Sequence, residues 1–259
     1  MFPISDEPDP NAHGPAVVTL LIILANVAVF VFLQQLGHND AFTYAFSMVP
    51  HEVMTGHDVA NTVTMIDPIT GQSGGSIHLM PTPIPTWMTV FTSMFMHGGF
   101  MHLFGNMLFL WIFGDNLEHA MGSVKFLFYY LLCGVAAAAA QIVATVATGA
   151  NDFIPMLGAS GAISGVLGGY MLLFPTRRVN VLLGYFITAV PAWFALGLWF
   201  LFQLVSGLGI FGTDSQVGGV AYAAHIGGFI TGLWLVRAFA NRAEATDNLH
   251  RYYRSRMRM

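Results

Sequence analysis

Two side chains that could together carry out acyl-transfer chemistry occur in stretches that are otherwise apolar and rich in glycine. Ser160 lies in G-A-S-G at 158–161, and His225 lies in A-H-I-G-G-F-I-T-G at 224–232. Polar side chains at membrane depth are costly, so each is a functional candidate by default. A serine hydroxyl becomes a strong nucleophile when a neighbouring imidazole accepts its proton. This pair therefore predicts hydrolysis of a carbonyl compound within the lipid, provided that the fold brings the two residues together.

We expect Ser160 about one turn into a helix that begins after Pro155, close to the outer face of the membrane. A helix N-terminus favours developing negative charge and supplies free backbone N–H groups. Serine is also a small residue that lets membrane helices pack closely. Taken alone, Ser160 would be better explained by that packing role.

His225 favours the catalytic interpretation, because its segment also starts outside and places the imidazole at a depth comparable to that of Ser160. Small residues at a spacing that lets two helices approach closely lie on matching faces of the two segments: Gly161, Gly165, Gly168, Gly228 and Gly232. A purely structural role, in which His225 bonds to a neighbouring helix, stays open.

A third group of polar residues is centred on His102 and Asn106, which are four residues apart and so share one helix face. Both could donate a hydrogen bond to the oxyanion that forms when serine attacks a carbonyl, and the backbone N–H of Ser160 could add another. Alternatively, both only tie their helix to its neighbours. His97 is expected to point elsewhere and to orient the adjoining loop. Because no carboxylate lies within reach of His225, we predict a Ser–His dyad and not a triad.

The elements that must position these residues are membrane helices. Hydrophobic residues make up 55% of the 259 residues and charged residues 8%, whereas about 25% is charged in a soluble domain. Apolar runs of about 20 residues predict an all-α bundle of six transmembrane helices with a long first outer loop. The runs lie at 16–34, about 91–113, 126–147, 155–174, 191–208 and 217–240.

The basic residues predict the orientation, because Lys and Arg near membrane segments stay on the cytoplasmic side. All nine fall on one side of the six-span model, so both termini are expected in the cytoplasm. We expect a disordered cytoplasmic tail at 1–14, a six-helix domain at 15–240 and a basic cytoplasmic tail at 241–259. The first run has no basic flank and no A-x-A cleavage site, so a retained span is expected. An acidic leader without arginine argues against a transit peptide and favours a bacterial plasma membrane.

The connections contain further signals. The outer loop from 37 to 89 is aromatic at first, which predicts a part that lies at the membrane interface, and glycine-rich at 67–76, which predicts a loop or hairpin. The fifth span should begin near Pro191, since proline suits the first turn of a helix. Asn26 and Gln203, near the ends of their spans, are expected to be hydrogen-bond partners between helices.

Three motifs in this order resemble those of the rhomboid family of intramembrane serine proteases. They are H-x-x-x-x-H-x-x-x-N at 97–106, G-x-S-G at 158–161 and A-H-x-x-G-x-x-x-G at 224–232. The resemblance implies that Ser160 is the nucleophile, that His225 is the general base and that His102 and Asn106 contribute to the oxyanion hole. It also implies a membrane-embedded first outer loop, a water-filled cavity open to the outside, and substrates that are single-span membrane proteins cut near their outer boundary.

The sequence departs from the pattern of many relatives at two positions. Trp87 is followed by Met88, where many relatives carry a Trp-Arg pair, and Ser164 stands where some relatives place an aromatic residue. Neither position belongs to the dyad. They bear on how the outer loop is anchored and how the histidine is packed.

Several other classes of protein were weighed. A silent relative that binds client helices usually lacks the nucleophile or the base, and this chain has both. A channel or transporter would explain the intramembrane His and Asn but not a glycine-framed Ser paired with His, and no internal repeat supports a transporter. No H-E-x-x-H occurs, which disfavours a metalloprotease, and Asp115 has no second aspartate. We expect no cofactor, no metal and no nucleic-acid partner; the oligomeric state is left open.

Overall fold

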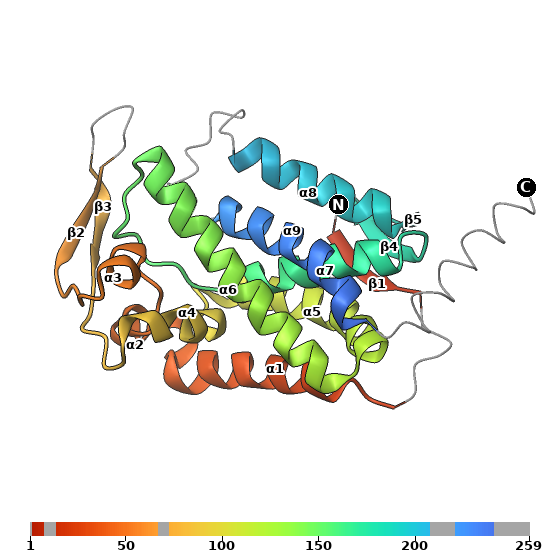
Figure 1. The fold of residues 1–259 in the computed structure, drawn as a ribbon, viewed down its shortest axis with the longest axis horizontal. Coiled ribbons are helices and arrows are strands. Elements are labelled where there is room, and N and C mark those ends of the chain that lie inside the picture. The colour runs from red at the N-terminus through yellow and green to blue at the C-terminus, as the bar shows by residue number, and fades with distance from the viewer. Residues whose placement is uncertain (1, 8–13, 67–72, 208–220, 241–259) are drawn as a thin grey trace, which may run out of the picture.

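The computed structural model describes residues 2–7, 14–66, 73–207 and 221–240, and most of these residues are helical (Figure 1). The long helices of the bundle are α1 (Val17–Ala28), α5 (Phe100–Met121), α6 (Ser123–Thr148), α7 (Ser160–Leu173), α8 (Ala192–Gly207) and α9 (Tyr222–Phe239). Shorter helices, α2 (Asp40–Ala45), α3 (Pro50–Thr55) and α4 (Thr89–Thr92), follow α1. The expected basic tail at 241–259 lies outside the described residues.

Each predicted apolar run overlaps one of the long helices, but the fit to the runs is uneven. The second run was expected from about 91, whereas α5 begins at Phe100, because residues 96–99 are not helical and precede it. The first run continues beyond α1 as a π-helical turn, Val29–Leu33. Among the described helices, α6 alone is long and apolar enough to cross a membrane by itself, while 17–33, α7 and α8 are apolar but shorter.

Helices α7 and α9 pack backbone against backbone, as the glycine spacing predicted. A Cβ added at Gly168 would lie 2.2 Å from the carbonyl oxygen of Phe229, and one added at Gly228 would lie 2.1 Å from that of Gly161. Both distances are far below van der Waals contact, so only glycine fits there. From α6, the buried Tyr129 hydroxyl lies 2.7 Å from the Gly165 oxygen, which ties a third helix to this contact.

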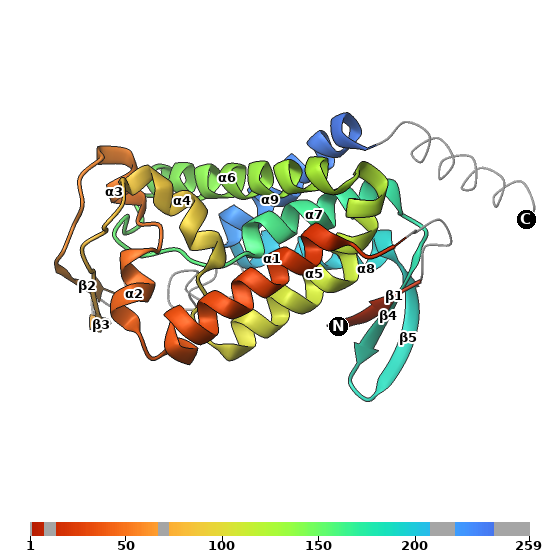
Figure 2. The same ribbon diagram turned by 90° about the horizontal axis from the view of Figure 1, so that it is seen from below.

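A three-stranded antiparallel sheet lies at one end of the bundle (Figures 1 and 2). The segment that connects α1 to α5, called the outer segment below, lies at the opposite end. Its strands are β1 (Phe2–Asp6), β4 (Arg178–Leu183) and β5 (Phe186–Pro191), with β4 in the middle. The expectation of a disordered tail at 1–14 is therefore wrong for residues 2–7. The β-branched residues between the fourth and fifth runs supply β4 and β5, and β4 gives the N-terminal strand a partner far away in the sequence.

Polar contacts fix β1 against the helices. The Asp6 carboxylate accepts hydrogen bonds from the Tyr170 hydroxyl at 2.7 Å and from the Asn116 side-chain amide at 3.0 Å. Arg177 donates to the side-chain oxygen of the same Asn116. Immediately after β5, α8 begins at Ala192, which confirms the predicted start of this helix near Pro191.

Glu118, near the end of α5, holds the first turn of α1. Its carboxylate accepts bonds from the backbone N–H groups of Val18 and Thr19, at 2.9 and 2.7 Å, and from the hydroxyls of Thr19 and Ser123, at 2.8 and 2.6 Å. A negative charge beside a helix N-terminus is favourable, and the first N–H groups of a helix otherwise lack partners. This buried carboxylate therefore joins α1 to α5 and α6.

The outer segment after α1, where a loop or hairpin was predicted, contains a hairpin formed by β2 (Thr62–Ile66) and β3 (Ser73–His78). Gln34, at the end of the first helical run, binds the backbone of the segment that precedes α5. Its side-chain amide accepts from the backbone N–H of His97 and donates to the carbonyl oxygen of the same residue, both at 2.9 Å. This pair of bonds holds the segment that leads into α5.

Candidate active site

Ser160 is the first residue of α7, not a residue one turn inside the helix as expected. The difference comes from Gly158, whose φ of +123° interrupts any helix that would start at Pro155. The backbone N–H of Gly158 donates to the carbonyl oxygen of Ser93 at 2.9 Å. A Cβ at Gly158 would lie 2.8 Å from the imidazole of His102, so a glycine here lets that ring lie beside the approach to Ser160.

The imidazole of His225 reaches the Ser160 hydroxyl. The Nε2 atom of His225 lies 2.8 Å from the Ser160 Oγ, within hydrogen-bond distance. His225 stands in the first turn of α9, where its own N–H bonds to the carbonyl oxygen of Ala221. The glycine contacts between α7 and α9 bring the two helix starts together, and the separation of 65 residues in sequence is closed by this packing.

The other ring nitrogen of His225 also has a partner, Gln203, which the sequence motifs do not include. The Nδ1 atom lies 2.9 Å from the side-chain oxygen of Gln203, in α8. The expectation that Gln203 bonds between helices is confirmed, and its partner is the candidate base. Asn26, in contrast, donates to the carbonyl oxygen of Ile22 in its own helix, and among the described residues its amide group forms no bond to another helix.

His97, His102 and Asn106 gather in one cluster. The Asn106 amide nitrogen lies 3.0 Å from the Nε2 of His97, and the rings of His97 and His102 meet edge to face at 5.1 Å. The prediction that His97 points away from the other two is wrong, because His97 precedes α5 and does not follow helical spacing. Of the three, His102 has its ring beside Gly158, two residues before Ser160, whereas the amide of Asn106 is engaged by His97.

The aromatic neighbour of His225 does not come from position 164, where this chain has a serine. The hydroxyl of Ser164 donates to the carbonyl oxygen of Ser160 at 2.7 Å, within α7. An aromatic neighbour comes instead from α8, where the ring centroid of Trp199 lies 6.1 Å from that of His225. Helix α8 thus supplies both an aromatic neighbour and an amide partner to the candidate base.

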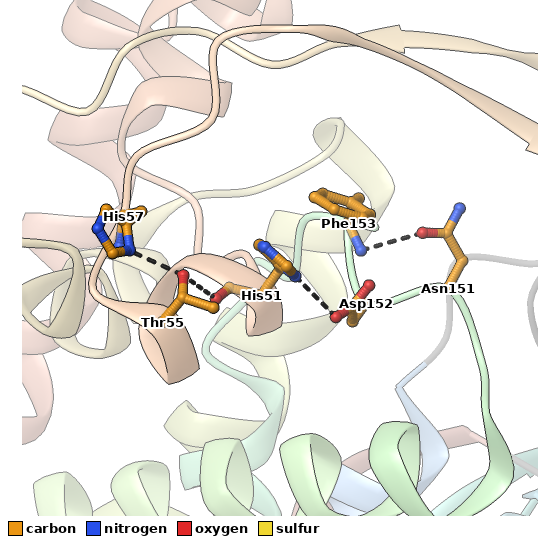
Figure 3. Close-up of polar contacts among 6 residues, drawn as sticks. All are labelled: His51, Thr55, His57, Asn151, Asp152 and Phe153. Atoms are coloured by element: carbon orange, nitrogen blue, oxygen red, sulfur yellow. Dashed lines mark hydrogen bonds and ion pairs between the residues drawn. The ribbon is translucent and has the colours of Figure 1, made fainter.

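The outer segment is attached to the stretch of chain that leads into Ser160 (Figure 3). The Nδ1 of His51, in α3, lies 2.9 Å from the carboxylate of Asp152, and the His51 ring stacks on Phe153 with 4.3 Å between centroids. The backbone of Met48 forms a β-bridge with Met156. Position 88, where many relatives carry an arginine, is a methionine in this chain. The contacts described here anchor the outer segment instead. In the part of the chain that the structure describes, no group of three or more His, Cys, Asp or Glu residues is arranged to hold a metal ion.

Comparison with known proteins decides the family. Residues 85–242, which include α5 to α9 and all the residues of the candidate site, match the model of the Rhomboid domain. The chain belongs to the rhomboid family. This rhomboid is therefore an integral membrane protein, mostly helical, from a family associated with intramembrane proteolysis.

This rhomboid is similar to relatives from yeast, human and a bacterium. It is 34% identical over 146 residues to "Rhomboid protein 1, mitochondrial" of Saccharomyces cerevisiae, which covers 56% of this chain and 40% of the relative. The human "Presenilin-associated rhomboid-like protein, mitochondrial" is 32% identical over 146 residues, or 56% of this chain and 36% of that protein. "Rhomboid protease GluP" of Bacillus subtilis is 30% identical over 152 residues, or 59% and 26%. The match thus spans well under half of each relative.

Proposed function

We propose that this rhomboid is a serine endopeptidase that cleaves transmembrane segments of single-span membrane proteins near the outer face of the membrane. The observation that carries the proposal is the 2.8 Å contact between the Ser160 Oγ and the His225 Nε2. Those two atoms must exchange a proton if serine is to attack a carbonyl. Similarity to a relative named a protease, the Bacillus subtilis protein, supports the same reaction class.

The reaction follows from the geometry of the dyad. His225 Nε2 accepts the Ser160 proton as Oγ attacks the peptide carbonyl carbon, and the carbonyl electrons move onto oxygen. As the tetrahedral intermediate collapses, the C–N bond breaks and the leaving amine takes the proton from His225. Water then attacks the acyl-serine and gives its proton to His225, and the second collapse returns the proton to Oγ and releases a carboxylic acid.

The developing oxyanion needs donors. The start of α7 offers backbone N–H groups and the positive end of the helix dipole beside Ser160. We assign His102 and Asn106 to the same role. His102 lies beside Gly158, while Asn106 must exchange its contact with His97 for the oxyanion. One such donor contributes roughly 3 kcal/mol of transition-state stabilisation.

The remaining sequence predictions belong to the same proposal. Six membrane spans within 15–240 are supported by the six long helices at the positions of the apolar runs. Cytoplasmic termini, a cytoplasmic basic tail at 241–259 and a membrane-associated outer segment complete the topology that we propose. A bacterial plasma membrane stays a prediction, because the matched relatives include mitochondrial proteins as well as a bacterial one.

Labelling and cleavage test the proposed activity. The full chain, reconstituted in liposomes with a single-span reporter, should cut the reporter and should react with a fluorophosphonate probe. Ser160→Ala and His225→Ala should abolish both signals, whereas Ser206→Ala, which changes a serine buried in α8, should retain them. Reporter cleavage by Ser160→Ala at the wild-type rate, or no labelling of the wild type, would exclude the proposal.

A further inference from the structure

Both ring nitrogens of His225 are engaged, one on each side of the ring. Nε2 faces the Ser160 hydroxyl at 2.8 Å, and Nδ1 faces the side-chain oxygen of Gln203 at 2.9 Å. A neutral imidazole carries one proton, so one nitrogen donates and the other accepts. An amide oxygen can only accept. The proton therefore lies on Nδ1, and Nε2 is left free to accept the proton of the serine.

We propose that Gln203 is a positioning residue for catalysis, so that the site works as a Ser160–His225–Gln203 chain of hydrogen bonds. This inference rests on the proposed function. The amide oxygen holds the imidazole in the tautomer and orientation that the reaction needs. It keeps accepting the Nδ1 proton when Nε2 becomes protonated, and so stabilises the imidazolium that forms after attack. Gln203 touches neither the substrate nor the nucleophile and acts through His225.

The surroundings explain why an amide suits this position better than a carboxylate would. Gln203 is only 7% exposed and stands in a largely apolar helix. An ionised carboxylate there would be costly while the imidazole is neutral, because a buried charge needs a charged or hydrogen-bonded partner. An amide orients the ring at no such cost, although it stabilises the imidazolium less strongly than a carboxylate.

The contact also makes the site depend on α8. Ser160 and His225 come from α7 and α9, which are fixed to each other through glycines, whereas Gln203 comes from a third helix. Side chains provide the contact between α8 and α9, for example the stacked rings of Phe200 and Phe229, with 4.4 Å between centroids. The dyad can therefore stay together while the third member leaves, and a shift of α8 would lower the reactivity of the dyad without breaking it.

Substitutions at Gln203, read by steady-state kinetics on the reconstituted full chain, test this role. Gln203→Met keeps the length of the side chain and removes the acceptor. We expect kcat to fall about 10- to 100-fold, by analogy with the cost of losing a residue that orients a metal-binding histidine, with KM little changed. Gln203→Glu should restore much of kcat and move the acidic limb of the kcat profile to higher pH, because a carboxylate favours the imidazolium.

A matched control is available at Gln141. Its side-chain oxygen accepts from the backbone N–H of Ala224, next to His225, at 3.2 Å. Gln141→Met removes an α6 amide that bonds to the same turn of α9 as His225, without touching the imidazole, so kcat and the pH profile should stay close to wild type. A loss at Gln141 equal to that at Gln203 would assign both residues to helix packing.

The outcomes separate this inference from the function on which it rests. Wild-type kcat in Gln203→Met, together with an inactive Ser160→Ala, would overturn the role of Gln203 and leave the protease intact. Cleavage by Ser160→Ala would remove the proposed function itself. If Gln203→Met does not fold, Gln203→Glu decides: a wild-type pH profile in this variant would contradict the inference, because a side chain that only ties helices together has no effect on proton affinity.

Discussion

The backbone of Gly232 approaches the carbonyl oxygen of Gly165 so closely that a Cβ at residue 232 would lie 2.0 Å from that oxygen. Neither group can move aside, since both belong to the backbone of a long helix. The contact lies in the α7–α9 interface that also places the serine beside the histidine. Stability and activity should therefore fail together when it is disturbed.

Replacing Gly232 with alanine tests this coupling. Gly232→Ala should lower stability by about 1–3 kcal/mol, the usual cost of overpacking, and should reduce fluorophosphonate labelling of Ser160 because α7 and α9 must move apart. Gly197→Ala, in α8, is the matched control, since no atom of the described residues outside the adjoining helix backbone lies within 4 Å of the added Cβ. Thermal unfolding in detergent and the labelling rate are the measurements. Equal unfolding temperatures and labelling rates in the two variants would contradict this coupling, because the α7–α9 interface would then accommodate the added methyl group.

The carboxylate of Glu118 should contribute strongly to the docking of α1. Glu118→Gln keeps the shape but places an NH₂ group among donors. We expect a loss of about 1–3 kcal/mol, the cost of leaving buried polar groups unsatisfied. Ser123→Ala removes only one of the four bonds and should cost less. The two melting curves in detergent provide the test, and a larger loss for Ser123→Ala would contradict this assignment.

Asp6 should make the docking of β1 depend on pH. Burial raises the pKa of Asp6 from 3.8 to about 6; Asp115 acts in the same direction, whereas the bond from Tyr170 and the charge of Arg177 lower it. Because the folded form binds its proton more tightly than the unfolded form, stability is greatest below about pH 4 and decreases until about pH 6. The pKa change corresponds to about 3 kcal/mol.

Hydrogen exchange of the amides paired between β1 and β4, corrected for the intrinsic effect of pH on exchange, measures this dependence. Protection of these amides should fall between pH 4 and 6 in the wild type. It should stay level in Asp6→Asn, because residue 6 no longer titrates. Ser5→Ala changes the same strand without changing its charge and should behave like the wild type. Identical profiles for the wild type and Asp6→Asn would reassign the effect to another group.

Steady-state kinetics can distinguish the contribution of Asn106 to catalysis from that of its partner His97. If Asn106 donates to the oxyanion, Asn106→Ala should lower kcat by about 10²-fold or more with KM largely unchanged. His97→Ala, which removes only the partner seen in the cluster, should cost much less. Comparable losses in both variants would mean that the two residues serve together to hold the start of α5, and unchanged kinetics for Asn106→Ala would make it structural.

Local patterns in the sequence predicted a large part of this structure. The apolar runs located the long helices, and the glycine spacing predicted the faces through which α7 and α9 meet. The glycine-rich stretch at 67–76 predicted a loop or hairpin, and the structure has a hairpin of β2 and β3 there. The three motifs pointed to the family that the comparison shows, and the proximity of Ser160 and His225 followed from their helices.

What the sequence could not supply depends on contacts between distant segments or on backbone geometry. β1 is a strand because β4 lies beside it, and no pattern within residues 1–14 predicts that partner. The φ of Gly158 moved the start of α7 to Ser160. The position of His97 before α5 brought it to Asn106. Gln203 meets His225 because of the rotation of α8 about its own axis, which composition does not indicate.

The bridge between Met48 and Met156 lies four residues before Ser160, close to the bond between His51 and Asp152. A substrate helix that displaces the outer segment on entry would pull on the same stretch of chain, which leads to the start of α7. Under the proposed function, we therefore expect the arrival of the substrate and the alignment of Ser160 to be mechanically linked. Substrates of equal affinity that displace this segment to different extents should then differ in turnover number.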